Sequence, residues 1–190
     1  MLKKNAHTLI TRAKTGDHAA LNKLFTEWYP RVYNWGYRYF GDEEMAAEIS
    51  QQAFMVMQQK LKQLKDPGSF KSWLYRTVLN LCHNETRRRK INNKAVERLT
   101  YRSKRDTAPA PDHLYMIKER SEQVLAALAR LPEEQRTVVI MKEYEDLKFR
   151  EIAEILKISE NTAKSRLYYA YKAMRKFFLT QPQTKAIRYE

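Results

Sequence analysis

Several residue types on which whole classes of protein depend are scarce in this sequence. It has one cysteine and four glycines among 190 residues. A single cysteine excludes an intramolecular disulfide and fits a reducing cytoplasm. There is no glycine-rich loop of the kind that cradles phosphate groups. Six prolines and few alternating β-branched runs favour an all-α protein.

The sequence also lacks a long apolar run. No segment approaches the roughly 20 apolar residues that a membrane-spanning helix needs. The first residues, MLKKNAHTLITRAKTGD, do not resemble a signal peptide. We therefore expect a cytoplasmic protein with no membrane insertion.

Residues suited to catalysis or metal binding are scattered. His7, His18, His83 and His113 have no metal-ligand spacing, and there is no second cysteine to join them. No pair of carboxylates stands out from the acids expected on helix surfaces. We therefore predict no enzyme activity, no catalytic residue, no metal site and no cofactor.

Positive charge, by contrast, is abundant. Lysine and arginine number 36 against 22 aspartate and glutamate, a formal net charge of +14. The excess occurs in both halves of the chain rather than in one basic tail. Such a balance favours a polyanionic partner, nucleic acid before membrane.

The segment 149–178 predicts two helices joined by a tight turn. In the first helix, apolar residues from Phe149 to Leu156 recur at helical spacing. Ser159 follows the turn and can cap the second helix through its hydroxyl. The other reading of such a pair is a plain structural hairpin, but the polar and basic second helix favours a helix-turn-helix that enters the major groove. Its DNA-binding candidates are Ser159, Glu160, Asn161, Thr162, Lys164, Ser165, Arg166 and Tyr169.

An acidic helix start and an amide-rich helix surface mark the segment 42–64. Asp42, Glu43 and Glu44 suit the positive end of a helix, and apolar residues from Met45 to Leu64 then follow one face. The remaining surface is nearly uncharged. Such a face suggests a protein partner, although an ordinary solvated face is the alternative. The binding candidates on it are Glu48, Gln51, Gln52 and Met55.

A third amphipathic helix is predicted after the turn at residues 65–69. Its apolar stripe begins at Phe70 and includes Trp73, which is more easily read as a core residue than as a base-stacking one. The opposite side is polar and basic, and it suits an unstacked single strand. A solvated helix end is the alternative for its arginine run. The candidates are Lys71, Arg76, Asn80, Asn84, Arg87, Arg88 and Arg89.

Helical periodicity is lost over residues 91–112, where Ala108-Pro109-Ala110-Pro111 is typical of a linker. We predict two small helical domains, 1–94 and 113–180, joined by a flexible linker, 95–112. Residues 180–190 form a polar end, and we take 181–190 as a tail. Pro30 predicts a new helix start within the first domain, as proline favours the first turn.

Three short motifs carry a family resemblance. LPEEQR at 131–136, EIAEIL at 151–156 and TAKSRL at 162–167 resemble region 4 of extracytoplasmic-function sigma factors, small members of the bacterial sigma-70 family. SFKSWLYRTVLN at 69–80 looks like the family's SFRAWLYRIARN. The segment 42–64 resembles region 2.2. The chain departs from the pattern at Lys157, where the family usually has glycine, and at Ala163, where it usually has a β-branched residue.

The resemblance implies an alternative sigma factor that binds core RNA polymerase and directs promoter-specific initiation. The first domain would contact the β′ clamp helices and the −10 element, and the second the −35 element and the β flap. An anti-sigma factor is a further implied partner. Two other functions remain open on the sequence: a helix-turn-helix regulator that binds duplex promoter DNA without polymerase, and an adaptor that binds another protein.

Overall fold

The computed structural model describes the backbone of residues 2–96 and 112–180, and the side chains of residues 7–91 and 121–180. The predicted tail and most of the predicted linker lie outside these ranges. The described chain is helical and contains no strand, which confirms the all-α prediction. The first domain consists of α1 (Leu2–Lys14), α2 (His18–Phe40), α3 (Glu43–Lys60), the short 3₁₀ turns η1 (Leu61–Gln63) and η2 (Pro67–Ser69), and α4 (Phe70–Val96).

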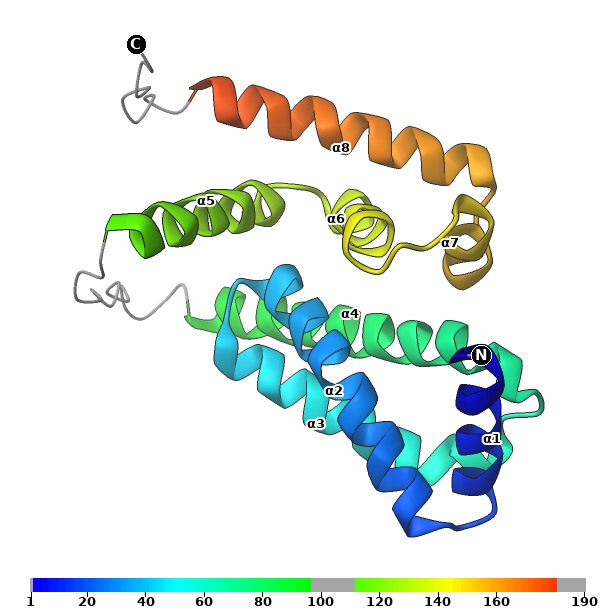
Figure 1. Cartoon of the computed structure of the whole chain (residues 1–190). Helices are drawn as coiled ribbons and strands as arrows, with labels where there is room; N and C mark the ends of the chain where they lie inside the picture. Colours follow the sequence, from blue (N-terminus) through cyan, green and yellow to red (C-terminus); the bar gives the residue numbers. More distant parts are fainter. Residues whose placement is uncertain (1, 97–111, 181–190) are drawn as a thin grey trace.

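The second domain holds the helix pair predicted from the sequence. It consists of α5 (Asp112–Ala129), α6 (Glu133–Val139), a π-helical turn η3 (Ile140–Tyr144), α7 (Phe149–Leu156) and α8 (Glu160–Thr180). In Figure 1, α8 is the outermost helix, and α5, α6 and α7 lie between it and the first domain. Helix α4 packs against α7, and α2 packs against α5 and η3. The two domains are therefore in direct contact.

Side-chain caps start two helices of the first domain, and the second of these helices begins at the acidic start predicted at residues 42–44. The Asp17 carboxylate accepts a hydrogen bond from the backbone N–H of Ala20 at 3.0 Å. The Asp42 carboxylate accepts one from the N–H of Met45 at 2.9 Å. Each bond satisfies a backbone donor that has no partner inside the helix. Gly41 ends α2 in the left-handed conformation, with φ of 67°.

The predicted helix start at Pro30 is wrong, because α2 runs through it without interruption. A proline inside a helix removes the hydrogen bond to the carbonyl four residues earlier, here that of Thr26. Both Thr26 and Pro30 are exposed, so water can reach that carbonyl. Packing of α2 on α1 and α3 then keeps the helix in one piece.

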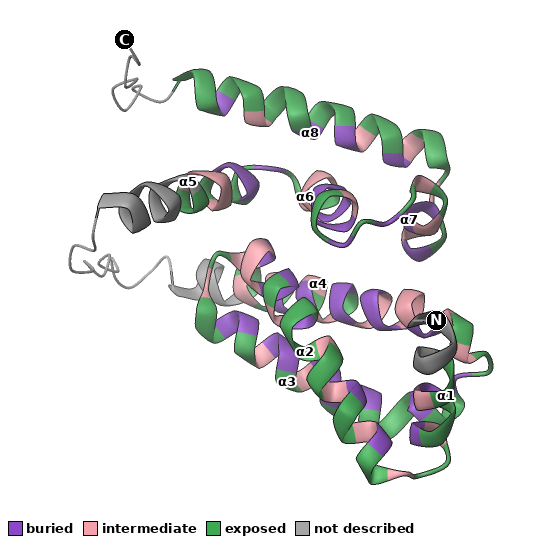
Figure 2. Cartoon of the chain, viewed as in Figure 1, coloured by how far each residue is buried: buried purple, intermediate pink, exposed green. Residues whose placement is uncertain are grey.

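The core of the first domain is built around aromatic residues of α2. Trp35 and Tyr39 are fully buried, whereas Tyr33 and Tyr37 are half-buried. Trp35 stacks on Tyr75 of α4 with ring centroids 5.2 Å apart. Figure 2 shows that buried residues recur along α4, which packs against α2 and α3.

One close helix contact sets the packing of α2 on α3. A Cβ atom on Gly36 would lie 3.0 Å from the Cα of Ala46, so α2 and α3 approach closely only because residue 36 is glycine. In α4, Phe70, Leu74 and Val78 are buried as predicted. Trp73 packs against the core with part of its surface exposed.

Lys157 provides a test of backbone strain. Its φ of 55° and ψ of 46° place a lysine in the left-handed region, at the position where the resembled family usually has glycine. Replacing it with glycine (Lys157→Gly) should raise the free energy of unfolding by about 1 kcal/mol, because glycine adopts this conformation without a Cβ clash. Urea unfolding followed by circular dichroism measures the change.

The matched control is Lys172→Gly in the middle of α8, where the backbone is helical. There glycine should lower the free energy of unfolding by about 1 kcal/mol. Equal destabilisation by both substitutions would show that residue 157 is not strained.

Candidate nucleic-acid interface

The turn between α7 and α8 has the geometry of a helix-turn-helix. The backbone N–H groups of Lys157 and Ile158 both reach the carbonyl of Ala153, the second at 3.0 Å, and close the end of α7. The Ser159 hydroxyl accepts the N–H of Thr162 at 3.0 Å, which confirms the predicted cap of α8. Ala153 and Ala163 are both buried where the helices cross. The small side chain at residue 163 lets the helices approach closely.

The first turns of α8 present a polar surface to solvent. Glu160, Asn161, Lys164, Ser165 and Tyr169 are exposed. Most of the outward face of α8 is exposed in Figure 2, on the side away from the first domain. The structure thus brings these predicted DNA-binding residues together on one accessible helix. Their contact with DNA stays a prediction.

Three other predicted residues of this helix already have partners within the domain. The hydroxyls of Ser159 and Thr162 lie 2.8 Å apart and are hydrogen-bonded to each other at the start of α8. The Arg166 guanidinium lies 2.6 Å from the Glu134 carboxylate, and its side chain is only 24% exposed. No short sequence pattern indicates this pair, because α6 and α8 are separate helices whose register is set by packing.

The basic side of α4 is only partly free. Arg76, Asn80 and Asn84 recur every four residues and therefore share one helix face. Asn80 and Asn84 are exposed. Arg76, however, donates hydrogen bonds to the backbone carbonyls of Glu154 at 2.7 Å and Ile155 at 3.2 Å, at the end of α7. Part of the predicted −10 surface is therefore occupied by the second domain.

The arginine run at the end of α4 is paired rather than simply solvated. Glu85, which is 8% exposed, lies 2.7 Å from Arg88 and 3.0 Å from Arg89. Arg88 also lies 3.7 Å from Glu48. Arg87 is exposed, and Lys71 is half-buried. Glu85 is an organising residue that the sequence reading missed, although its spacing of three and four residues from the two arginines could have indicated it.

The predicted protein-binding face lies on α3. Gln51 and Met55 are exposed, and the Gln52 amide donates to the Glu48 carboxylate at 3.0 Å. Next to this face is a cavity of about 500 Å³ between α2 and α3. It is lined by Phe25, Thr26, Tyr29, Pro30 and Phe54. An apolar hollow beside amide groups suits an amphipathic partner better than a phosphate backbone.

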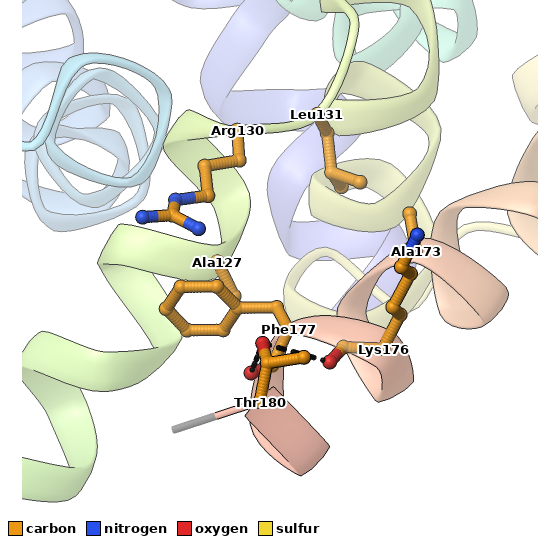
Figure 3. Close-up of a pocket in the computed structure, with 7 residues that line it drawn as sticks. All are labelled: Ala127, Arg130, Leu131, Ala173, Lys176, Phe177 and Thr180. Atoms are coloured by element: carbon orange, nitrogen blue, oxygen red, sulfur yellow. Dashed lines mark hydrogen bonds between the residues drawn. The ribbon is translucent and has the colours of Figure 1, made fainter. Parts of the chain in front are cut away.

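Two of the cavities among the described residues open on the second domain. The larger, about 610 Å³, lies between α5, α6, η3 and α8 and includes Tyr144, Met174 and Phe178. The smaller, about 190 Å³, lies between α5 and α8 and is shown in Figure 3. There the Arg130 guanidinium sits 4.7 Å from the centre of the Phe177 ring. Both are on the C-terminal half of α8, away from the predicted recognition residues.

The described residues contain no group of three histidine, cysteine, aspartate or glutamate side chains that could hold a metal ion. None of the described helices is long and apolar enough to cross a membrane. Cys82 is buried, and this burial raises the pKa of its thiol, so reaction with solvent species is disfavoured.

Comparisons with known proteins match both domains. The model for sigma-70 region 2 matches residues 24–91, and the model for sigma-70 region 4 matches residues 121–174. The chain is 28% identical over 183 residues to the ECF RNA polymerase sigma factor SigW of Bacillus subtilis, covering 93% of this chain and 96% of SigW. It is 29% identical over 167 residues to ECF sigma factor SigE of Mycolicibacterium smegmatis, covering 86% of this chain and 64% of that longer relative.

A solved structure supports the fold. The sigma factor RpoE of Bartonella quintana, determined with the anti-sigma factor NepR, superposes with a TM-score of 0.67 at 16% identity. The match covers 85% of this chain and 98% of RpoE. A helix-turn-helix domain joined to a second helical domain is typical of DNA-binding transcription factors. The matches to sigma-70 regions 2 and 4 identify the family within that class. The chain belongs to the sigma-70 family, among the extracytoplasmic-function (ECF) sigma factors.

The cap of α8 can be tested by removing a hydroxyl. Ser159→Ala should lower the free energy of unfolding by about 1 kcal/mol, because the N–H of Thr162 then loses its acceptor. Ser165→Ala, six residues further along the same helix and exposed, is the control and should not destabilise the protein. Thermal unfolding of both variants makes the comparison. Equal stabilities would contradict the capping role.

Proposed function

We propose that this protein binds core RNA polymerase and directs initiation at promoters by recognising a −10 and a −35 element. The observation that carries the proposal is the exposed, polar start of α8, held by a capped turn in a chain that matches sigma-70 regions 2 and 4 in order. The exposed start of α8 supports recognition of a base sequence. The match to sigma-70 regions 2 and 4 supports binding to polymerase.

The second domain would read the −35 element as duplex DNA. A recognition helix enters the major groove with its N-terminal residues at the base edges. Asn161, Lys164 and Ser165 are exposed in the first two turns of α8 and can reach those edges. An asparagine suits adenine, and a lysine suits guanine. Arg166 would have to leave Glu134 to reach a base or a phosphate.

The first domain would hold the −10 element, partly as a single strand. Asn80 and Asn84 offer amides to base edges, and the cations beside them follow the phosphates. Arg88 and Arg89 share the carboxylate of Glu85, which fixes their direction along α4 and lowers their net charge. The predicted residues Lys71, Arg76 and Arg87 complete this surface.

Polymerase would contact both domains at apolar hollows. The exposed face of Gln51 and Met55, with the 500 Å³ cavity beside it, suits the β′ clamp helices. The 610 Å³ cavity beside Tyr144 and Phe178 suits the β flap. An anti-sigma factor is a further partner, because RpoE, which has the same fold, was determined with one.

The protein would act in the cytoplasm and without catalysis of its own. The family is regulatory, and the polymerase supplies the chemistry. The test of the proposed function is run-off transcription with sigma-free core polymerase on a library of promoter fragments. Transcripts that start at fixed points only when this protein is present are the expected result. Duplex binding without core association or transcription would instead identify a regulator that acts alone.

Arg166→Ala should weaken binding to a −35 duplex taken from such a promoter. Loss of one base-specific arginine contact reduces affinity by about 1–3 kcal/mol and relaxes the preference at one base pair. Lys172→Ala removes one charge from an exposed position of the same helix and is the matched control. Fluorescence anisotropy with the promoter duplex measures the affinity, and the same measurement with single-base variants of the duplex measures the base preference. If the two variants lose the same affinity and keep the same base preference, Arg166 does not read sequence.

A further inference from the structure

A buried carboxylate lies beneath the arginine run at the end of α4. Glu85 is 8% exposed, and its two carboxylate oxygens meet different arginines. The Nε atom of Arg88 lies 2.7 Å from one oxygen, and the Nε atom of Arg89 lies 3.0 Å from the other. The side chains of the two arginines are 61% and 41% exposed. One acid that solvent hardly reaches therefore holds two accessible cations.

The contact with Glu85 leaves donors of both guanidinium groups for another ligand. In each arginine the atom that meets the carboxylate is Nε rather than a terminal Nη. Nη2 of Arg88 lies 3.7 Å from the carboxylate of Glu48 on α3, which is longer than a hydrogen bond. A guanidinium carries five N–H donors in one plane, and these fit the oxygens of a phosphate group. The terminal donors of Arg88 and Arg89 can therefore serve a phosphate while Nε serves Glu85.

Two other helices support the arginines from the side. The guanidinium carbon of Arg89 lies 5.4 Å from the centre of the Phe40 ring at the end of α2, within the range of a cation–π contact. Glu48, which stands near Arg88, accepts a hydrogen bond from the Gln52 amide at 3.0 Å and is thereby held on α3. Helices α2, α3 and α4 all pack against one another. The core of the first domain thus fixes the surroundings of both arginines.

Glu85 has two opposite effects on the binding of a polyanion. A long side chain loses rotamer freedom when it binds a ligand, and a side chain that is already held in place loses less. Positioning of the two arginines therefore favours binding. The negative charge of Glu85 opposes it, because it weakens the positive field that attracts a polyanion. An experiment that removes the acid shows which of the two effects is larger.

We propose that Glu85 is a positioning residue that makes Arg88 and Arg89 a clamp for a phosphate group of single-stranded DNA. The effect of positioning exceeds the effect of charge, so the acid raises the affinity of α4 for the strand. Arg88 continues the every-fourth-residue stripe of Asn80 and Asn84, so a strand held at the clamp passes both amides. The proposal deepens the proposed function and rests on it for the identity of the ligand.

Replacement of Glu85 by glutamine tests the clamp. Glu85→Gln leaves one acceptor oxygen and no charge, so it cannot hold both arginines. Glu27→Gln makes the same change of charge at an exposed position of α2 and is the matched control. If charge alone decided the affinity, both variants would bind DNA at least as tightly as the parent protein. The clamp predicts that Glu85→Gln binds about fivefold more weakly than Glu27→Gln.

Affinity is measured by fluorescence anisotropy with a labelled single-stranded 20-mer of random sequence. Each variant is measured alone and as a one-to-one complex with sigma-free core polymerase, with core polymerase alone as the blank. Variants are compared in the condition in which the parent protein binds more tightly. A parent protein that binds the strand in neither condition would overturn the proposal. Circular dichroism and thermal unfolding check that each variant is folded.

Lysine substitutions separate geometry from charge. Arg88→Lys combined with Arg89→Lys keeps both charges but removes the Nε atoms and the planar donors. This double variant should bind the strand about fivefold more weakly than the parent protein, and it tests the clamp even where Glu85→Gln lowers stability. Addition of Glu85→Gln to the double variant should cause no further loss, because Glu85 acts through the two arginines.

An affinity of Glu85→Gln equal to or higher than that of Glu27→Gln would overturn the clamp. An equal loss from Glu85→Gln in the parent protein and in the lysine variant would overturn it too, because Glu85 would then act through another part of the fold. Run-off transcription by the parent protein distinguishes these failures from failure of the proposed function. A protein that initiates transcription but shows no effect of these variants is a sigma factor without the clamp. A protein whose variants behave as described but which never initiates transcription keeps the clamp and loses the proposed function.

Discussion

A buried carboxylate makes one of several polar contacts that hold the two domains together. Glu145 reaches the first domain from a π-helical turn, a local widening of the helix that is often found at functional positions. Its partners there are a tyrosine hydroxyl and an arginine, and more cations stand nearby. Removal of one partner from a buried charge is strongly unfavourable, so the contact forms as a unit or not at all.

The consequence is that the two predicted DNA-binding surfaces differ in how accessible they are. The recognition face of α8 is complete in the structure, because its cap, its turn and its helix crossing are all internal to the second domain. On α4, by contrast, the second domain occupies the Arg76 end of the predicted stripe. Arg76 serves the end of α7 in the closed protein and cannot serve DNA at the same time.

Local features of this fold could be predicted from the sequence, and distant ones could not. The cap at Ser159 depends on a neighbour three residues away, and the structure confirms it, as it confirms the acidic helix start at residues 42–44. Lys157 adopts the left-handed conformation at the position where the resembled family usually has glycine. Pro30 was misjudged because packing of α2 against two other helices outweighs the local effect of proline.

For the predicted binding surfaces, too, local features could be predicted and contacts between distant residues could not. The sequence indicated which side chains lie on the polar faces of α4 and α8, since helical spacing fixes that. It could not indicate that Arg166 pairs with Glu134, or that Glu145 meets Tyr75 some 70 positions earlier. Such pairs arise from the register of whole helices, and no short pattern in the sequence encodes them.

The most direct measurement is energy transfer in the parent protein, labelled once in each domain, as sigma-free core polymerase is added. The closed contact and the proposed role in initiation together predict high transfer in the free protein and a fall that saturates at one protein per core enzyme. Transfer that stays high in a complex that initiates transcription would contradict them, because the second domain would then still cover the Arg76 end of α4.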